Sequence, residues 1–170
     1  MRKAMLLLAV FGLASLLFIM PLSAVAQTKA SGTGECGKPD PTYTIQVPGE
    51  NGFTYVIGEY KCTWPKSFTV EGLQSTQNVF VEFDEVTGDL SRSISSGYTQ
   101  FNNGDKAYWR YIGTSDTKTM LASGTWTYTR GTGKLLGIKG SGTTTCKLKP
   151  AGAGSICEIK GEYTLPPAKK

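Results

Sequence analysis

Downstream of residue 26, the chain alternates apolar and polar positions in short runs that turn-forming residues separate from one another. A two-residue period over such short runs is typical of β-strands with one buried face. The turns carry Gly, Asn, Asp and Pro, as in VTGD and NNGD. The runs cover residues 54–62, 67–74, 78–83, 90–101, 105–113, 120–129, 135–146 and 156–165.

This pattern predicts an all-β fold. After residue 26 no run of ten positions repeats with helical spacing, and evenly spaced strands with Gly and Asn turns favour an antiparallel barrel or sandwich. We expect an eight-stranded antiparallel barrel over residues 53–166, with a β-sandwich as the alternative. Residues 27–52, rich in Gly, Pro, Thr and Ser, read as an N-terminal arm attached at Cys36, and residues 167–170 as a basic tail.

The alternation also separates the two faces of each strand. In the run 78–83, Val79, Val81 and Phe83 form an apolar side that we expect to face the core. Glu82 and Asp84 then lie on the opposite side and are expected in solvent, because charged residues are mostly exposed. A buried acid pair that serves as acid and base is the alternative interpretation.

The first 26 residues have the features of a secretory signal. Arg2 and Lys3 precede an apolar segment, residues 4–20, and Ala24-Val25-Ala26 is a small-x-small cleavage site. We expect a mature chain that begins at Gln27, is periplasmic or secreted, and has no stable membrane insertion after cleavage. A retained membrane anchor is the alternative, since the apolar segment comes close to the length of a bilayer span.

The charge of the chain argues against a nucleic-acid partner. The net charge of the full chain is +5, and cleavage would remove two basic residues and no acidic ones, which leaves +3. The remaining basic residues are scattered, whereas nucleic-acid binding calls for a clustered basic face. We expect no nucleic-acid partner, and the sequence leaves the oligomeric state open.

Four cysteines in an oxidising compartment predict two disulfides. Cys146 and Cys157 flank a Pro- and Gly-containing loop between two predicted strands, so they face each other across a hairpin. We therefore expect Cys146–Cys157 and Cys36–Cys62. The chain has no CxxC and no histidine, so we expect no zinc, no other metal and no cofactor.

The stretch GTWTYTRGTGKLLGIKGSGTTTC, residues 124–146, contains a GTGK that suggests a phosphate loop. That motif needs Ser or Thr after the lysine and a following helix, but Lys134 precedes Leu135 and the next residues are β-forming. Gly131 and Gly133 suit a tight hairpin, and the later glycines suit a strand that bends. We expect these glycines to shape the sheet rather than to bind phosphate.

The same stretch, together with NGDKAYWRYIGT upstream and the closing GEYTL, resembles secreted bacterial proteins of the allene oxide cyclase-like barrel group. The resemblance covers residues 102–165 and implies an eight-stranded antiparallel barrel of the calycin type. Most bacterial members of that group have no assigned activity. The plant cyclases of this fold use a glutamate and ordered water inside the barrel, and no residue here matches that glutamate.

Two classes of function remain open. The absence of histidine excludes Ser-His-Asp and Cys-His catalysis. We expect a non-enzymatic exported barrel that binds a small apolar or aromatic molecule or a protein partner. The alternative is an isomerase or cyclase that acts on a hydrophobic substrate through a buried carboxylate and water.

Aromatic residues in the second half of the chain are the best candidates for contacts with a small hydrophobic ligand. Several share a strand face with glycines that leave space beside them, and an eight-stranded barrel is wide enough for one small ligand. An aromatic core that fills the interior is the alternative. We expect Trp64 to close one barrel mouth. The candidate ligand contacts are Tyr98, Trp109, Tyr111, Trp126, Tyr128 and Tyr163.

Overall fold

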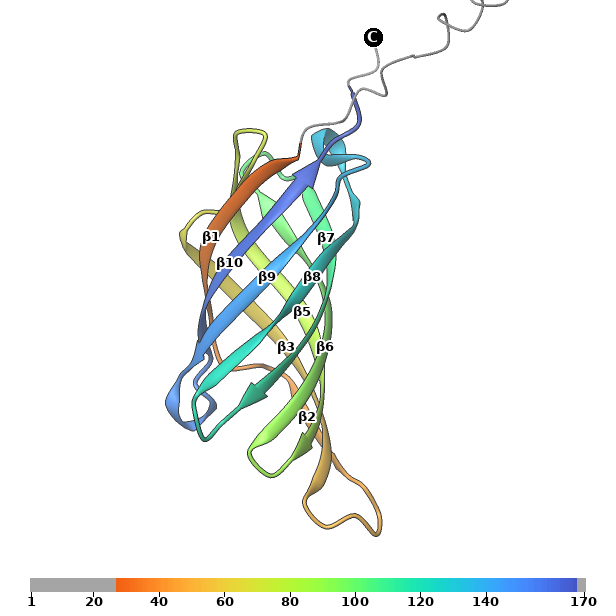
Figure 1. The fold of residues 1–170 in the computed structure, drawn as a ribbon, viewed down its shortest axis with the longest axis vertical. Helices are drawn as coiled ribbons and strands as arrows, with labels where there is room; N and C mark the ends of the chain where they lie inside the picture. Colours follow the sequence, from red (N-terminus) through yellow and green to blue (C-terminus); the bar gives the residue numbers. More distant parts are fainter. Residues whose placement is uncertain (1–26, 168–170) are drawn as a thin grey trace, which may run out of the picture.

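The computed structural model describes residues 27–167 as a closed, eight-stranded antiparallel barrel (Figure 1). The predicted signal segment and residues 168–170 of the predicted tail lie outside the described residues. The barrel strands are β1 (Thr28–Cys36), β3 (Phe53–Lys66), β5 (Leu73–Thr87), β6 (Leu90–Phe101), β7 (Lys106–Asp116), β8 (Leu121–Gly131), β9 (Lys139–Leu148) and β10 (Ser155–Thr164). Two short strands, β2 (Thr42–Gln46) and β4 (Thr69–Val70), and two 3-10 turns, η1 (Gly133–Leu135) and η2 (Pro150–Gly152), complete the described elements.

The sheet closes on itself through strand β3. Going around the wall, the strands follow the order β1, β10, β9, β8, β7, β6, β5 and β3, and β3 returns to β1. The first part of β3 pairs with β2, and only its last residues, between Cys62 and Lys66, pair with β1. The closing seam is therefore the shortest pairing in the barrel wall. No helix of residues 27–167 is long and apolar enough to cross a membrane.

The prediction of an eight-stranded barrel is confirmed, although the strands differ from those expected in three places. Residues 28–36, assigned to the N-terminal arm, form β1 in the barrel wall between β10 and β3. The runs 67–74 and 78–83 were expected as two barrel strands. Instead, the first run holds the two-residue β4 and the start of β5, and the second lies within the same long strand β5. The run 135–146 begins with the end of η1, and its strand starts only at Lys139.

Both predicted disulfides are present. Cys36–Cys62 joins β1 to β3 across the closing seam, and Cys146–Cys157 joins β9 to β10. Each bridge links residues that are direct partners in the sheet register. Two disulfides in so small a domain indicate an oxidising environment.

One end of the barrel is filled by a hydrophobic core. Leu135 of η1 is fully buried at this end, and Phe101 and Val70 are almost completely shielded from solvent. Tyr163 donates its hydroxyl to the Glu71 carboxylate at 3.3 Å and accepts the Glu71 backbone N–H at 3.0 Å, which holds the β4–β5 turn. The cluster consists of Phe68, Val70, Leu73, Phe101, Ala107, Trp126, Tyr128, Leu135, Ile138 and Tyr163.

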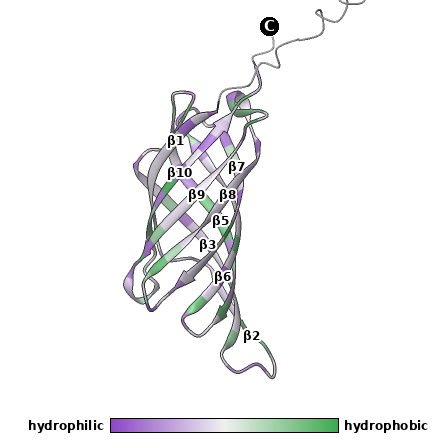
Figure 2. Cartoon of the chain, viewed as in Figure 1, coloured by the Kyte–Doolittle hydropathy of each residue, from purple (hydrophilic) through white to green (hydrophobic). Residues whose placement is uncertain are grey.

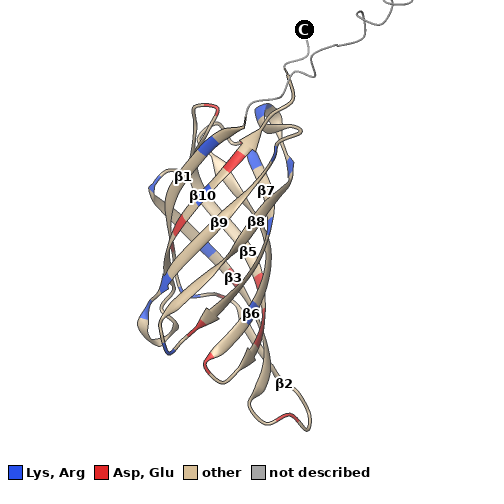
Figure 3. Ribbon diagram, viewed as in Figure 1, with Lys and Arg blue, Asp and Glu red and all other residues tan. Residues whose placement is uncertain are grey.

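Residue types are mixed along the wall. Hydrophobic and hydrophilic residues are mixed along the strands (Figure 2), and acidic and basic residues are interspersed over the barrel (Figure 3). On the outside of the wall, Phe83, Ile94 and Ile112 lie side by side on β5, β6 and β7. Ile94 and Ile112 are 42% and 57% exposed, so the outer face carries an apolar row.

Candidate functional site

A cavity of about 600 Å³ occupies the barrel between the core-filled end and the opposite end. All eight barrel strands contribute to its wall. Its floor is formed by Phe68, Trp64 and Trp126, whose rings lie about 6 Å apart. Loop residues surround the mouth at the opposite end: Pro39, Thr117, Met120, Lys149 and Gly152. The part of the interior beyond the core-filled end is therefore open.

Four of the six aromatic residues singled out from the sequence line this cavity: Trp109, Tyr111, Trp126 and Tyr128. Trp126 and Tyr128 meet edge to face with ring centroids 4.9 Å apart. The structure thus brings these four side chains together on β7 and β8. Whether they bind a ligand remains a prediction.

The other two candidates lie elsewhere. Tyr98 faces the outside of β6, where its ring packs on Tyr108 and lies 4.2 Å from the Lys106 ammonium. Tyr163 is buried in the core-filled end, where it holds Glu71. Neither residue is in the cavity wall, because the Tyr98 side chain lies on the outer face of β6 and Tyr163 lies beyond the floor. Trp64, expected at a mouth, lies instead at the floor.

Glycines explain how so many rings leave space between them. A Cβ on Gly142 or Gly161 would run into the Trp126 ring, so this ring lies directly over the two neighbouring glycines of β9 and β10. The Tyr111 phenol likewise covers Gly113 and Gly124. Glycine under a ring lets the ring lie close to the wall, and the centre of the barrel stays open.

Strand β3 and strand β5 add a second aromatic pair that the sequence reasoning did not select. Tyr60 and Phe80 stack with centroids 4.9 Å apart and an interplanar angle of 5°. Phe80 also packs against Trp109, with centroids 5.4 Å apart. Tyr60, Phe80 and Trp109 therefore form one ring cluster, and Tyr128 of the β8 pair is the register partner of Trp109. We call the rings of β3, β5, β7 and β8 that line the cavity the aromatic wall.

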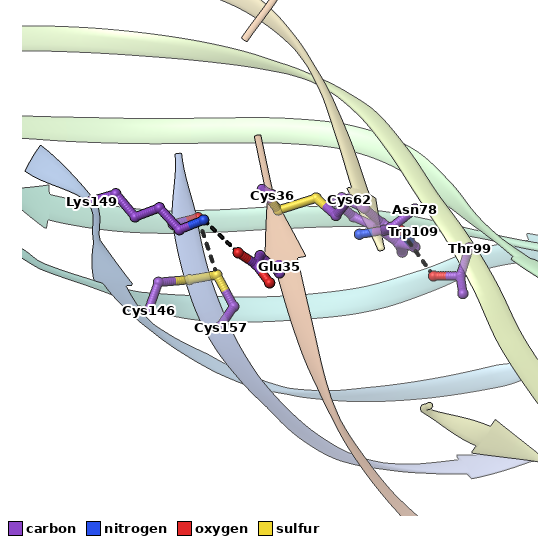
Figure 4. The surroundings of a disulfide bond; sticks show 10 residues. Glu35, Cys36, Cys62, Asn78, Thr99, Trp109, Cys146, Lys149 and Cys157 are labelled. Carbon is purple, nitrogen blue, oxygen red and sulfur yellow. Dashed lines mark hydrogen bonds and ion pairs between the residues drawn. A yellow bond between two sulfur atoms is a disulfide. The ribbon is translucent and has the colours of Figure 1, made fainter. Parts of the chain in front are cut away.

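A hydrogen-bond network fixes Trp109 in this wall (Figure 4). The indole Nε1–H of Trp109 donates to Asn78 Oδ1 at 3.2 Å, and the Thr99 hydroxyl donates to the same oxygen at 3.0 Å. Asn78 Oδ1 thus accepts hydrogen bonds from side chains of β6 and β7. Buried polar side chains with satisfied partners hold a unique geometry, so the Trp109 ring is held in place.

Glu82 and Asp84 line the cavity, which corrects the expectation that they face solvent. Val81, expected to face the core, is 49% exposed on the outside. The alternation along β5 was read correctly, but the inner and outer faces were exchanged. The reason is that the interior at this level is a polar-walled cavity, where Ser93 and Ser95 of β6 are the register partners of Asp84 and Glu82.

The two carboxylates have neutral hydrogen-bond donors as partners. The Ser93 hydroxyl donates to Asp84 Oδ1 at 2.5 Å. Burial, together with the negative charge of Asp84, raises the pKa of Glu82 from 4.5 to about 7, although a hydrogen bond from Ser95 acts in the opposite direction. Burial also raises the pKa of Asp84. Glu82 can therefore bind or release a proton near neutral pH.

The charges of the two acids also affect the pKa of two neighbouring tyrosines. Burial raises the pKa of the Tyr60 and Tyr111 phenols, and the negative charges of Glu82 and Asp84 raise it further. Both phenols therefore stay protonated at neutral pH and remain available as hydrogen-bond donors beside the acids.

Within the cavity wall, the basic side chain lies at the mouth. Lys149, which follows β9, pairs with Glu35 of β1 at 2.6 Å, and Figure 4 shows this pair beside the Cys146–Cys157 bridge. Lys149 is the one basic residue of the cavity wall in the described part of the chain. Residues 27–167 contain no group of three or more His, Cys, Asp or Glu side chains arranged to hold a metal ion.

Two buried donors on the cavity wall have no hydrogen-bond partner among the described residues. They are the indole Nε1–H groups of Trp64 and Trp126, and Trp126 is only 6% exposed. A buried polar group without a partner costs free energy, so these two donors reduce the stability of the folded state.

The sequence reasoning did not select the serine and threonine residues of the cavity wall, because these residue types usually indicate exposed positions. Serines and threonines on a strand are usually exposed, yet Ser93, Ser95 and Thr99 are all buried at the cavity wall. A usable signal was present in β6, where the serines and glycine of SRSISSG alternate opposite the acids of β5.

No family model matches the sequence, and no curated protein is similar to it at a significant level. Solved structures share its fold. The pterocarpan synthase dirigent protein PsPTS1 has a TM-score of 0.53 and 9% identity, over 84% of this chain and 97% of that chain. This likeness shows a shared barrel fold.

Two further solved structures are similar at lower scores. The pterocarpan synthase dirigent protein GePTS1 has a TM-score of 0.47 and 10% identity, over 83% of this chain and 89% of that chain. A conserved protein of unknown function from Rhodopseudomonas palustris has a TM-score of 0.44 and 11% identity, over 82% of this chain and 99% of that chain.

Proposed function

We propose that this protein binds a small, largely apolar molecule inside its barrel and works outside the cytoplasm. The cavity of about 600 Å³ carries this proposal, because known small-molecule sites have this size, apolar and aromatic walls, and a few convergent polar groups. Two disulfides and the signal-like first 26 residues support export to the periplasm or the medium. Affiliation with the allene oxide cyclase-like group remains a hypothesis from the glycine-spaced strands.

A neutral fluorescent amine, N-phenyl-1-naphthylamine, tests the binding proposal. We expect saturable binding with a dissociation constant in the micromolar range, which corresponds to about −8 kcal/mol. Trp109→Ala, which removes a ring from the wall, should weaken binding at least about tenfold, a loss within the range for a buried aromatic contact. Tyr98→Ala, on the outside of the same sheet, is the matched control and should leave binding unchanged.

The proposal is contradicted if the probe does not bind, or if Trp109→Ala and Tyr98→Ala weaken its binding equally. The second result would place the probe on the outer face of the barrel, where Tyr98 and the apolar row lie.

Acid–base catalysis on a hydrophobic substrate is the second candidate, and the inward position of Glu82 favours it. A carboxyl with a pKa of about 7 both accepts and donates protons at neutral pH. The same barrel fold occurs in PsPTS1, whose name describes a synthase. Catalysis requires that a bound molecule place a reactive C–H or leaving group within hydrogen-bond reach of Glu82 or Asp84.

Exchange of solvent deuterium into an enolisable apolar ketone, 2-tetralone, tests this candidate. NMR should show faster exchange of the α-protons with the protein than with buffer, and Glu82→Gln should abolish the difference. If the ketone binds but its exchange rate does not change, the protein binds without catalysing proton transfer.

A further inference from the structure

The two cavity carboxylates lack an opposite charge. The one basic side chain of the described cavity wall, Lys149, lies at the mouth and is paired with Glu35. Glu82 and Asp84 are approached by serine hydroxyls, which donate hydrogen bonds but carry no charge. A buried anion without a counter-charge is costly, so the interior favours a positive group.

The aromatic wall favours the same kind of group. A cation over the face of a Trp or Tyr ring is attracted by the ring, more strongly when it is shielded from water. Trp109, Tyr111 and Tyr60 line the cavity with the acids, and Tyr60 and Tyr111 are close enough to feel their charge. Carboxylates and aromatic rings thus line the same cavity, with Tyr60 and Tyr111 nearest to the acids.

The two acids also exclude other classes of ligand. A neutral hydrocarbon would leave both carboxylates without a counter-charge. An anion would meet the repulsion of the two acids.

We propose that the cavity selects organic cations: molecules with an apolar or aromatic body and an ammonium group that lies between Glu82, Asp84 and the surrounding rings. This inference rests on the proposed binding function and names the class of ligand. Charge compensation of the two acids, and not only the shape of the cavity, then sets specificity.

The proposal carries a pH dependence. A bound cation stabilises the ionised carboxylates, so its affinity rises as pH increases through about 7, the pKa of Glu82. The titratable groups that line the cavity are Glu82, Asp84, Tyr60, Tyr111, Tyr128 and Lys149. The tyrosines titrate well above this window, because burial raises the pKa of each. Lys149 with Glu35 lies at the mouth.

Three naphthalene compounds of similar size and fixed charge test the proposal by displacement of N-phenyl-1-naphthylamine. They are 2-naphthyltrimethylammonium, the neutral isostere 2-tert-butylnaphthalene, and 2-naphthalenesulfonate. At pH 8 the cation should bind at least about tenfold more tightly than the isostere, and the sulfonate least tightly. At pH 5.5 the preference for the cation should shrink.

Two double variants provide the decisive comparison. Glu82→Gln/Asp84→Asn should abolish the preference for the cation and retain binding of the isostere. Glu50→Gln/Glu158→Gln, which removes the same charge from exposed positions, should keep the preference. If the isostere binds wild type as tightly as the cation, or if the preference survives in the cavity variant, the inference is wrong and binding of apolar molecules stands. If none of the compounds binds, the proposed function fails as well.

Discussion

At the scale of single residues, the position of Glu82 distinguishes this barrel from one with a packed interior. Its carboxyl group is buried beside Asp84 and close to Tyr60 and Tyr111, with serine hydroxyls as hydrogen-bond partners. Such an arrangement costs stability when the group is ionised, because the charge is removed from water without a counter-charge. A cost of this kind at a cavity wall indicates a functional role more often than a structural one.

The raised pKa predicts how stability depends on pH. Below pH 4.5, both the folded and the unfolded state hold the Glu82 proton. Between pH 4.5 and about 7, the folded state holds it more tightly, so the free energy of unfolding falls as pH rises through this window. A shift of this size corresponds to roughly 3 kcal/mol.

Urea unfolding at pH 4.5 and pH 8 checks this prediction. Glu82→Gln should be more stable than wild type by roughly 2–3 kcal/mol at pH 8 and nearly equal to it at pH 4.5. Glu158→Gln, whose side chain is 68% exposed, is the control and should follow wild type at both values. Equal pH dependence in wild type and Glu82→Gln would show that Glu82 does not titrate in the cavity.

At the scale of strands, the period-2 pattern predicted the elements well and their orientation less well. It identified most strands of the barrel and the hairpin that pairs Cys146 with Cys157. For β5 it separated the faces correctly but placed Val81 inside and Glu82 outside. Hydropathy decides which face is inner only when the interior is a packed core, and here the interior is a cavity that accepts polar side chains.

Strand β1 was missed for a different physical reason. Its sequence, TKASGTGEC, has no large apolar residue, so it reads as an arm. Gly32 lies in a crowded place: a Cβ there would lie 2.9 Å from Phe68 atoms. The cavity-facing set was likewise predictable only in part, because Tyr98 and Trp109 lie on opposite faces of the sheet, and this depends on strand register that one sequence does not reveal.

The glycines under Trp126 provide a test at this scale. Gly161→Ala should lower the free energy of unfolding by about 1–3 kcal/mol, because its Cβ would collide with the Trp126 ring and with the Ser141 carbonyl. Gly37→Ala is the matched control, since nothing lies within 4 Å of a Cβ there, and it should be neutral. Chemical denaturation measures both. A neutral Gly161→Ala would mean that Trp126 does not lie against this part of the wall.

At the scale of the whole molecule, the barrel has one end filled by packed side chains and one open interior space, which we propose as the binding site. Leu135, Phe101 and Val70 are buried in the core-filled end. The two disulfides join β1 to β3 and β9 to β10 in the wall around the cavity. The cavity wall carries glycines, serines and two acids that lack a counter-charge. The outer apolar row on β5, β6 and β7 is the rival location for an apolar probe.

The tryptophans offer the most direct test of the claim that the barrel interior is the binding site. The chain has three tryptophans, Trp64, Trp109 and Trp126, and all three line the cavity. In a ¹H–¹⁵N NMR spectrum their indole N–H groups give three separate signals. Titration with 2-naphthyltrimethylammonium or N-phenyl-1-naphthylamine should shift all three signals along one saturation curve. Binding that leaves the three signals unchanged would place the ligand on the outer face and would contradict this account.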